Sequence, residues 1–149
     1  VKERQAWFTC GLVRLTTNLL DGTFPDYTRV IPRDCPIKVQ MSTAAALGAV
    51  RQAMVGVESN GVQGVKLSLA KDRAVFASFG GSEGSAQASL PVGYAGEPFE
   101  IGFKPEYMMD GLRALNAEAF ELEMTAPDQP AMIRGTGDFV YVFMPMSLS

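Results

Sequence analysis

The sequence contains no histidine. Ser-His and Cys-His nucleophile pairs need imidazole as a base, and most catalytic zinc sites use it as a ligand. The absence of histidine therefore excludes most hydrolases and zinc enzymes. We expect no catalytic residue, no metal site and no cofactor.

Cysteine is scarce and long apolar runs are missing. Cys10 and Cys35 are the two cysteines, too few to form a disulfide framework, and no cluster of other metal ligands accompanies them. A reduced, cytoplasmic setting fits this usage. No uninterrupted apolar run approaches the roughly 20 residues that a membrane-spanning helix needs. We therefore expect no membrane partner.

Positive charge is also in short supply. The net charge of −3 gives no overall attraction to nucleic acid. The 149 residues are 47% hydrophobic and 19% charged, which suits one globular domain with an extra segment. The N-terminus, Val1 to Arg4, has neither an initiator methionine nor a signal peptide. We expect the chain to be a fragment of a longer protein.

From residue 37 onward, hydrophobic patterning predicts a first structural unit. A strand over 37–41 precedes a helix that Ser42 and Thr43 can cap and that Asn60-Gly61 can end. Within this helix the apolar residues recur at helical spacing: Leu47, Val50, Met54 and Val57. Strands over 65–70, 74–79 and 85–91 follow, with turns at Lys71-Asp72 and at residues 80–82.

The same order then repeats. A strand over 99–103 leads into a helix over 105–115, and three more strands cover 119–125, 131–134 and 139–144. Two strand-helix-three-strand units predict a duplicated α+β domain with antiparallel sheets and both helices on one side. Residues 1–32 lie outside this duplication. They predict short strands over 6–10 and 12–17 and an irregular connector.

The predicted strand 119–125 contains two carboxylates at alternate positions. Glu121 and Glu123 alternate with Phe120, Leu122 and Met124, which is the pattern of a half-buried strand. We interpret the two glutamates as its solvent-facing side and not as a catalytic pair.

The connector and the C-terminus together resemble one protein family. Residues 20–32 read Leu-Asp-Gly-Thr-Phe-Pro-Asp-Tyr-Thr-Arg-Val-Ile-Pro, and residues 141–148 read Tyr-Val-Phe-Met-Pro-Met-Ser-Leu. They are similar to the segment linking the second and third domains, and to the C-terminal motif, of bacterial DNA polymerase III beta subunits, the sliding clamps. Residues 99–103 leading into Tyr107 agree with the same family. The resemblance implies a DNA clamp fold, with residues 1–32 ending the middle domain and residues 33–149 forming the third domain.

The resemblance also implies a function without catalysis. Two clamp subunits join head to tail as a homodimer ring around duplex DNA and act as a processivity factor for DNA polymerase III. A closed ring needs only weak phosphate contacts to stay on the duplex. An acidic net charge is therefore compatible with DNA as a partner.

Clamps bind short peptides of polymerases, the clamp loader and repair proteins, in which a glutamine precedes a leucine-phenylalanine pair. By this resemblance the peptide pocket maps onto Pro25, Arg29, Val30, Lys104, Tyr107, Val142, Met144, Pro145 and Met146. Prolines in the connector stiffen it, and flexible methionine side chains suit a site with many ligands. The alternative is that these residues are ordinary core and turn positions. Ser147 stands where many clamps carry a basic residue.

The resemblance places the ring interface at Met54, Val55, Gln87 and Leu90. Alternatively, Met54 and Val55 simply pack inward. A different function is a stand-alone peptide-binding scaffold with a clamp-like fold that never encircles DNA. A phosphate-handling enzyme is suggested only by the glycine-rich residues 80–85, which lack the Gly-Lys-Ser/Thr ending of a P-loop.

Overall fold

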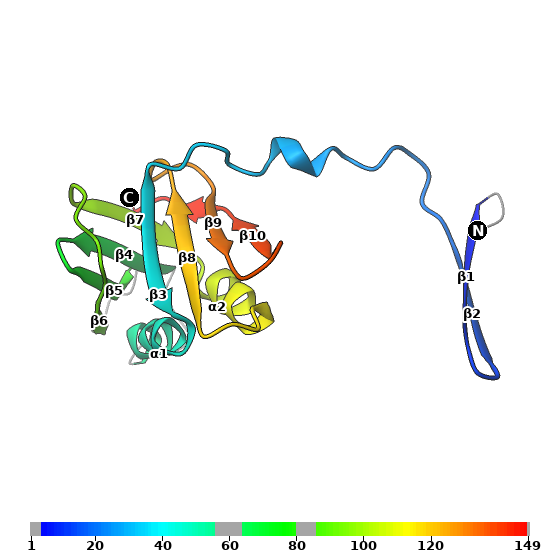
Figure 1. Cartoon of the computed structure of the whole chain (residues 1–149), viewed down its shortest axis with the longest axis horizontal. Helices are drawn as coiled ribbons and strands as arrows, with labels where there is room; N and C mark the ends of the chain where they lie inside the picture. The colour runs from blue at the N-terminus through cyan, green and yellow to red at the C-terminus, as the bar shows by residue number, and fades with distance from the viewer. Residues whose placement is uncertain (1–3, 56–63, 80–85, 149) are drawn as a thin grey trace.

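The N-terminal part of the chain forms a hairpin that stands apart from a globular domain (Figure 1). The computed structural model describes residues 4–55, 64–79 and 86–148. Strands β1 (Gln5–Cys10) and β2 (Val13–Asn18) pair antiparallel from Gln5↔Asn18 to Cys10↔Val13. Gly11 opens the loop between them with φ +56°, a conformation that glycine adopts without a steric penalty.

An extended connector joins the hairpin to the domain and contains one short 3-10 helix, η1 (Tyr27–Arg29). The side chain of Asp26 caps η1 by accepting a hydrogen bond from the backbone N–H of Thr28. Residues 11–30 are exposed along their whole length. The connector therefore has local structure but little packing.

The globular domain contains the two predicted units. The first comprises β3 (Ile37–Ser42), α1 (Thr43–Met54), β4 (Gly64–Ala70), β5 (Arg73–Phe79) and β6 (Gln87–Pro91). The second comprises β7 (Phe99–Phe103), α2 (Pro105–Ala114), β8 (Ala119–Met124), β9 (Ala131–Arg134) and β10 (Val140–Phe143), followed by β11 (Pro145–Met146). The predicted α+β fold class with antiparallel sheets is confirmed.

The two units exchange their first strands. One sheet has the order β10-β9-β8-β3 and the other has the order β11-β7-β4-β5-β6. Strand β3 of the first unit therefore pairs with β8 of the second, and β7 of the second unit pairs with β4 of the first. Both helices lie on the same side of the domain and contact each other (Figure 1). Each sheet thus contains strands from both halves of the sequence.

The local sequence explains the start of α1 and its close packing. Ser42 is the N-cap, as predicted, and its side chain accepts a hydrogen bond from the backbone N–H of Ala45. The buried side chains of α1 are small, so the helix backbone can approach β5 and β6 closely: Thr43, Ala46, Ala49, Val50 and Ala53. The other predicted residues of this region, Val57, Asn60-Gly61, residues 80–82 and the wider glycine-rich run 80–85, lie outside the described residues.

One hydrophobic core lies between the sheets and the helices. Alternate residues of β3, β4 and β5 point into it, as period-two patterning requires. Its largest fully buried side chains come from both units: Phe76, Phe103, Leu67, Leu69, Ile101, Met108, Leu112, Leu122, Met124 and Ile133. The turn at Lys71-Asp72 is confirmed, with Asp72 at φ +57°.

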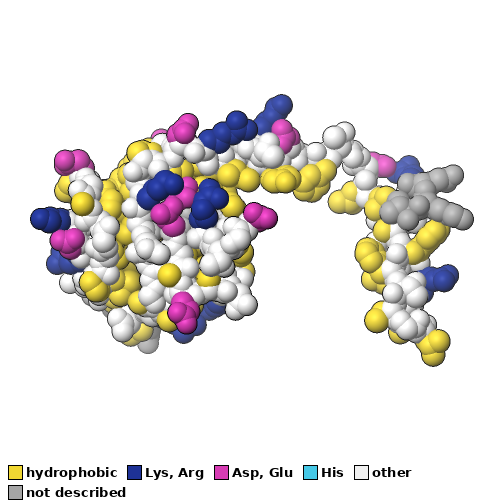
Figure 2. All heavy atoms as spheres, in the orientation of Figure 1, with side chains coloured by type: hydrophobic (Ala, Val, Ile, Leu, Met, Phe, Trp, Pro, Cys, Tyr) yellow, Lys and Arg dark blue, Asp and Glu magenta, His cyan; other side chains and the backbone are white. Residues whose placement is uncertain are grey.

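The predicted strand over 139–144 is confirmed as β10, and the short strand β11 that follows it belongs to the other sheet. One expectation needs correction. Glu123 is 3% exposed and not solvent-facing. A small group of charged side chains of both signs lies on the face of the domain that carries β3 and β8 (Figure 2). Lys38 on β3 and Arg134 on β9 pair with Glu123 on β8. These two side chains therefore bury Glu123, which the alternation of polar and apolar residues alone assigns to the solvent-facing side.

Within the described ranges, no helix is both long and apolar enough to cross a membrane.

Candidate functional site

The C-terminal segment, which contains β10 and β11, connects the edges of the two sheets. Strand β10 is the edge of one sheet and β11 is the edge of the other. Met144 lies between them, with 58% of its surface exposed, while the preceding Phe143 is 5% exposed. The ring of Phe143 meets that of Phe103 edge-on, at 5.8 Å between centroids. The exposed methionine therefore directly follows a buried residue that anchors the chain to β7.

The residues after Met144 are fixed to β7 by a glycine contact. Pro145 pairs with Phe103 and Met146 pairs with Gly102. A Cβ atom added at Gly102 would lie 2.7 Å from Cδ2 of Leu148 and 3.0 Å from the carbonyl oxygen of Met146. The tail therefore lies directly on the bare backbone at Gly102, which leaves no room there for a side chain.

A pocket of about 350 Å³ opens beside this tail. Its lining residues come from the tail and from the β8–β9 turn: Pro127, Asp128, Met144, Pro145, Met146, Ser147 and Leu148. The turn is closed by the Gln129 backbone N–H, which donates to the Ala126 carbonyl at 3.2 Å, so Pro127 and Asp128 are its central residues. Proline is favoured at the first central position because its φ is already fixed there. The opposite wall of the pocket is therefore rigid.

Pro127 and Asp128 are lining residues that sequence reasoning missed. Because Ala131 pairs with Phe143 in the antiparallel register of β9 and β10, the turn before Ala131 lies next to the residue after Phe143. Antiparallel pairing of the predicted strands over 131–134 and 139–144 would have placed this turn beside Met144. The proline-rich turn was therefore the signal in the sequence for these two lining residues.

Helix α2 packs against β10 and has two other predicted pocket residues, Lys104 and Tyr107, at its start. The Lys104 ammonium lies 5.8 Å from the centroid of the Tyr107 ring. Val142 is half-buried on β10, and its neighbour Tyr141 packs on α2, where a Cβ at Gly111 would lie 2.6 Å from the Tyr141 ring. Burial, then the charge of Asp110 and the nearby Tyr107 hydroxyl, raise the pKa of Tyr141 above its ordinary 10.0.

The connector residues of the predicted pocket are ordered locally but do not line it. Asp26 accepts hydrogen bonds from Thr28 Oγ1 at 2.6 Å and the Thr28 backbone N–H at 3.2 Å, which lower the pKa of Asp26 below 3.8. Its carboxylate also pairs with Arg29 Nε at 3.2 Å. Pro25, Arg29 and Val30 are exposed, and Val30 is 63% exposed. Of the predicted residues, Met144, Pro145 and Met146 line the pocket beside the tail. The others do not line it: Pro25, Arg29, Val30, Lys104, Tyr107 and Val142.

The residues predicted for the ring interface lie on two elements that touch. Helix α1, which ends at Met54, packs against β6, which contains Gln87 and Leu90. Met54 and Leu90 are half-buried, whereas Val55 is 69% exposed and Gln87 is exposed. Strand β6 is the outer strand of its sheet. This side of the domain therefore presents an open strand edge next to a helix end.

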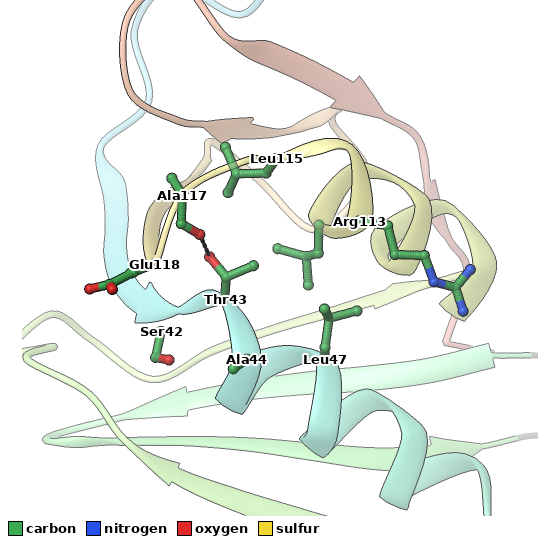
Figure 3. A pocket seen from close by; sticks show the side chains of 9 residues that line it. Ser42, Thr43, Ala44, Leu47, Arg113, Leu115, Ala117 and Glu118 are labelled. Atoms are coloured by element: carbon green, nitrogen blue, oxygen red, sulfur yellow. Dashed lines mark hydrogen bonds between the residues drawn. The ribbon is translucent and has the colours of Figure 1, made fainter.

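A second pocket, of about 560 Å³, lies between the start of α1 and the end of α2 (Figure 3). Leu47, Leu112 and Leu115 give it an apolar floor, and Thr43 Oγ1 donates to the Ala117 carbonyl at 2.8 Å. None of the predicted site residues line this pocket. Among the described residues, no group of three or more Cys, Asp or Glu could hold a metal ion.

The family model described as "DNA polymerase III beta subunit, C-terminal domain" matches residues 28–147. The chain belongs to the DNA polymerase III beta subunit family. A beta sliding clamp of Caulobacter vibrioides is 32% identical over 98% of the chain, which spans 40% of that relative. The relatives are sliding clamps, a family of non-catalytic processivity factors.

The fold agrees with solved clamps over almost the whole chain. A DnaN sliding clamp of Bartonella birtlesii bound to griselimycin matches 99% of the chain and 40% of its own, with a TM-score of 0.89 and 31% identity. A DNA polymerase sliding clamp of Bacillus subtilis matches 100% of the chain and 40% of its own, with a TM-score of 0.89 and 27% identity. Both matches include the hairpin and the connector.

Proposed function

We propose that this chain is the C-terminal part of a sliding clamp subunit, with residues 1–32 completing a middle domain and residues 33–149 forming the third domain. The whole protein acts in the cytoplasm as a homodimer ring around duplex DNA. It carries no catalytic chemistry. The family match over residues 28–147 supports this proposal.

The hairpin supports its assignment to another domain. One of its faces is apolar, because Phe8 pairs with Leu15 and Cys10 pairs with Val13. Phe8, Val13 and Leu15 are each more than half exposed. A two-stranded hairpin is marginally stable alone, and an amphipathic sheet normally buries its apolar face. Because the relatives are longer than this chain, further sequence of the whole protein is available to cover that face.

The pocket beside the tail is the proposed docking site for client proteins. These are DNA polymerase III and other polymerases, the clamp loader and repair proteins, each through a short peptide with glutamine, leucine and phenylalanine. The observation that carries the proposal is the exposed Met144 between two sheet edges, next to an apolar pocket of about 350 Å³. This volume is at the lower end of the range for small-ligand pockets, which suits one or two side chains. The methionines can repack around different ligands.

A titration of a labelled peptide tests the docking site. Fluorescence anisotropy would measure the Kd of a peptide containing the three residues, for the chain and for the double variant Met144→Ala, Val142→Ala. Met144 lines the pocket and Val142 lies two residues before it on β10. Truncation of a central contact residue costs about 1–2 kcal/mol or more, so we expect Kd to rise about tenfold or more.

A matched control removes the same two residue types elsewhere. The double variant Met54→Ala, Val55→Ala changes the end of α1 and should leave Kd unchanged. A peptide with alanine in place of leucine and phenylalanine should not bind. Equal affinity of the chain and the Met144/Val142 variant would refute the docking site.

The ring is tested on the full-length protein. Size-exclusion chromatography with light scattering should give the mass of a dimer. A monomer at all concentrations, combined with intact peptide binding, would favour the stand-alone scaffold over the ring.

A further inference from the structure

The β8–β9 turn contributes a carboxylate to the pocket beside the tail. Asp128 is one of the lining residues and is exposed. The rest of the lining is Pro127 and the tail residues 144–148, none of which carries an ionisable side chain. Any charge selection within this pocket would therefore come from Asp128.

The carboxylate of Asp128 has no charged partner of its own in the described parts of the chain. The ion pairs there involve the acidic residues Asp21, Asp26, Glu100, Asp110, Glu121 and Glu123. No side-chain hydrogen bond of Asp128 accompanies them within those ranges. Lys104, the N-cap residue of α2, instead faces the Tyr107 ring. The charge of Asp128 is therefore available to a ligand.

The position of Asp128 is fixed before a ligand arrives. It follows Pro127 in a turn closed by the hydrogen bond from Gln129 to Ala126. It faces a tail that Gly102 holds against β7. A charge that is already placed costs less conformational entropy when it pairs.

We propose that Asp128 selects, among client peptides, those with a lysine or arginine next to the apolar residues that enter the pocket. An apolar cavity with one acidic side chain at its wall is complementary to an apolar side chain flanked by a cation. The inference rests on the proposed docking function and adds the chemical class of the preferred client.

Three peptides of equal length test the selection. They share the glutamine, leucine and phenylalanine, and their flanking residues are lysine in the first, serine in the second and glutamate in the third. Because exposed ion pairs contribute little, we expect each step from lysine to serine to glutamate to raise Kd by about two- to fivefold. Raising the salt from about 0.05 to 0.5 M should remove most of this difference, because a carboxylate at the surface is screened.

Two substitutions assign the effect to one side chain. Asp128→Asn keeps the shape and should make the three affinities nearly equal. Asp128→Lys should invert their order. The control Asp138→Asn removes an exposed carboxylate at the opposite end of β9 and should preserve the lysine preference.

The outcomes separate the two proposals. If none of the three peptides binds, the docking function fails and the selection fails with it. If all three bind with equal affinity, or if Asp128→Asn keeps the lysine preference, the docking function stands and the role of Asp128 is wrong.

Discussion

Glu123 is a nearly buried carboxylate on β8 that remains charged. Its side chain is 4% exposed, and it accepts a hydrogen bond from Arg134 Nε at 2.8 Å and lies 3.4 Å from Lys38 Nζ. Burial alone would raise its pKa, but the interactions with Arg134, Glu121 and Lys38 outweigh burial and lower the pKa below 4.5. The folded domain therefore favours the ionised form.

Substituting Glu123→Gln removes this charge and should destabilise the domain. Hydrogen bonds to charged groups contribute about 1.5–3 kcal/mol, so we expect a loss of that order in the free energy of unfolding at pH 7. Because the folded pKa is lowered, the stabilisation is complete above pH 4.5 and is lost as the pH falls through the folded pKa. Urea denaturation at pH 7 and at lower pH should therefore show that the free energy of unfolding falls less on acidification in the variant than in the unsubstituted protein.

Glu121→Gln is the matched control for this prediction. The Glu121 side chain is 40% exposed and lies 3.5 Å from Lys38. Exposed pairs contribute less than about 1 kcal/mol. Equal losses for the two variants would contradict the special role of Glu123.

Gly102 lies so close to the C-terminal tail that a side chain at this position should disturb the tail. Gly102→Ala places a Cβ against Leu148 and the Met146 carbonyl, so β11 must shift. Overpacking of this kind costs about 1–3 kcal/mol, and the displaced tail should weaken peptide binding. Urea denaturation and the anisotropy titration measure the two effects. Gly93→Ala, which meets no atom within 4 Å, should leave peptide binding unchanged and should not lower the stability.

At the scale of elements, the two helices each contain a glycine in different surroundings. In α1 nothing lies within 4 Å of a Cβ added at Gly48, whereas in α2 a Cβ at Gly111 would meet the Tyr141 ring at 2.6 Å. The same substitution should therefore have opposite effects in the two helices.

Gly48→Ala should stabilise the domain by about 0.5–1 kcal/mol, because alanine restricts the unfolded chain and suits a helix interior. Gly111→Ala should destabilise it by about 1–3 kcal/mol, because the Tyr141 ring has to move away from α2. Urea denaturation of the two single variants measures both signs. A destabilised Gly48→Ala would mean that α1 requires the glycine for a reason other than space.

The sequence predicted most of these elements but not how they are combined. Ser42 predicted the start of α1, and the alternation of apolar and polar residues predicted the strands, because helix caps and periodicity are local properties of the sequence. The exchange of β3 and β7 between units depends on pairing over long sequence distances, which local patterns do not contain. The assignment of Glu123 to the solvent-facing side was wrong for the same reason, because Lys38 and Arg134 on the neighbouring strands cover it. Asp128 was missed because a turn residue shows its role only when its neighbour in space is known.

At the scale of the whole molecule, the hairpin and the globular domain should unfold independently. Trp7, the single tryptophan, lies in the hairpin and is 42% exposed. Its fluorescence should therefore not change in the cooperative urea transition that far-UV circular dichroism records for the domain. Removal of residues 1–19 should leave that transition unchanged. Coincident transitions by the two probes would contradict the independence of the two parts.

The proposed ring makes a prediction for the full-length protein. Val55→Asp adds a charge to an exposed apolar position at the end of α1, beside the open edge of β6. We expect light scattering to show monomers, while the Kd of the glutamine, leucine and phenylalanine peptide stays the same. Persistence of the dimer would remove Val55 from the interface.

The shared sheets have a consequence for how the domain could be divided. A cut in the loop between β6 and β7 would leave each fragment without the partner of its first strand. Neither half should hold tertiary structure in isolation, yet mixing the two should restore it by mutual complementation. The two units, although they repeat the same order of elements, should therefore fold only together.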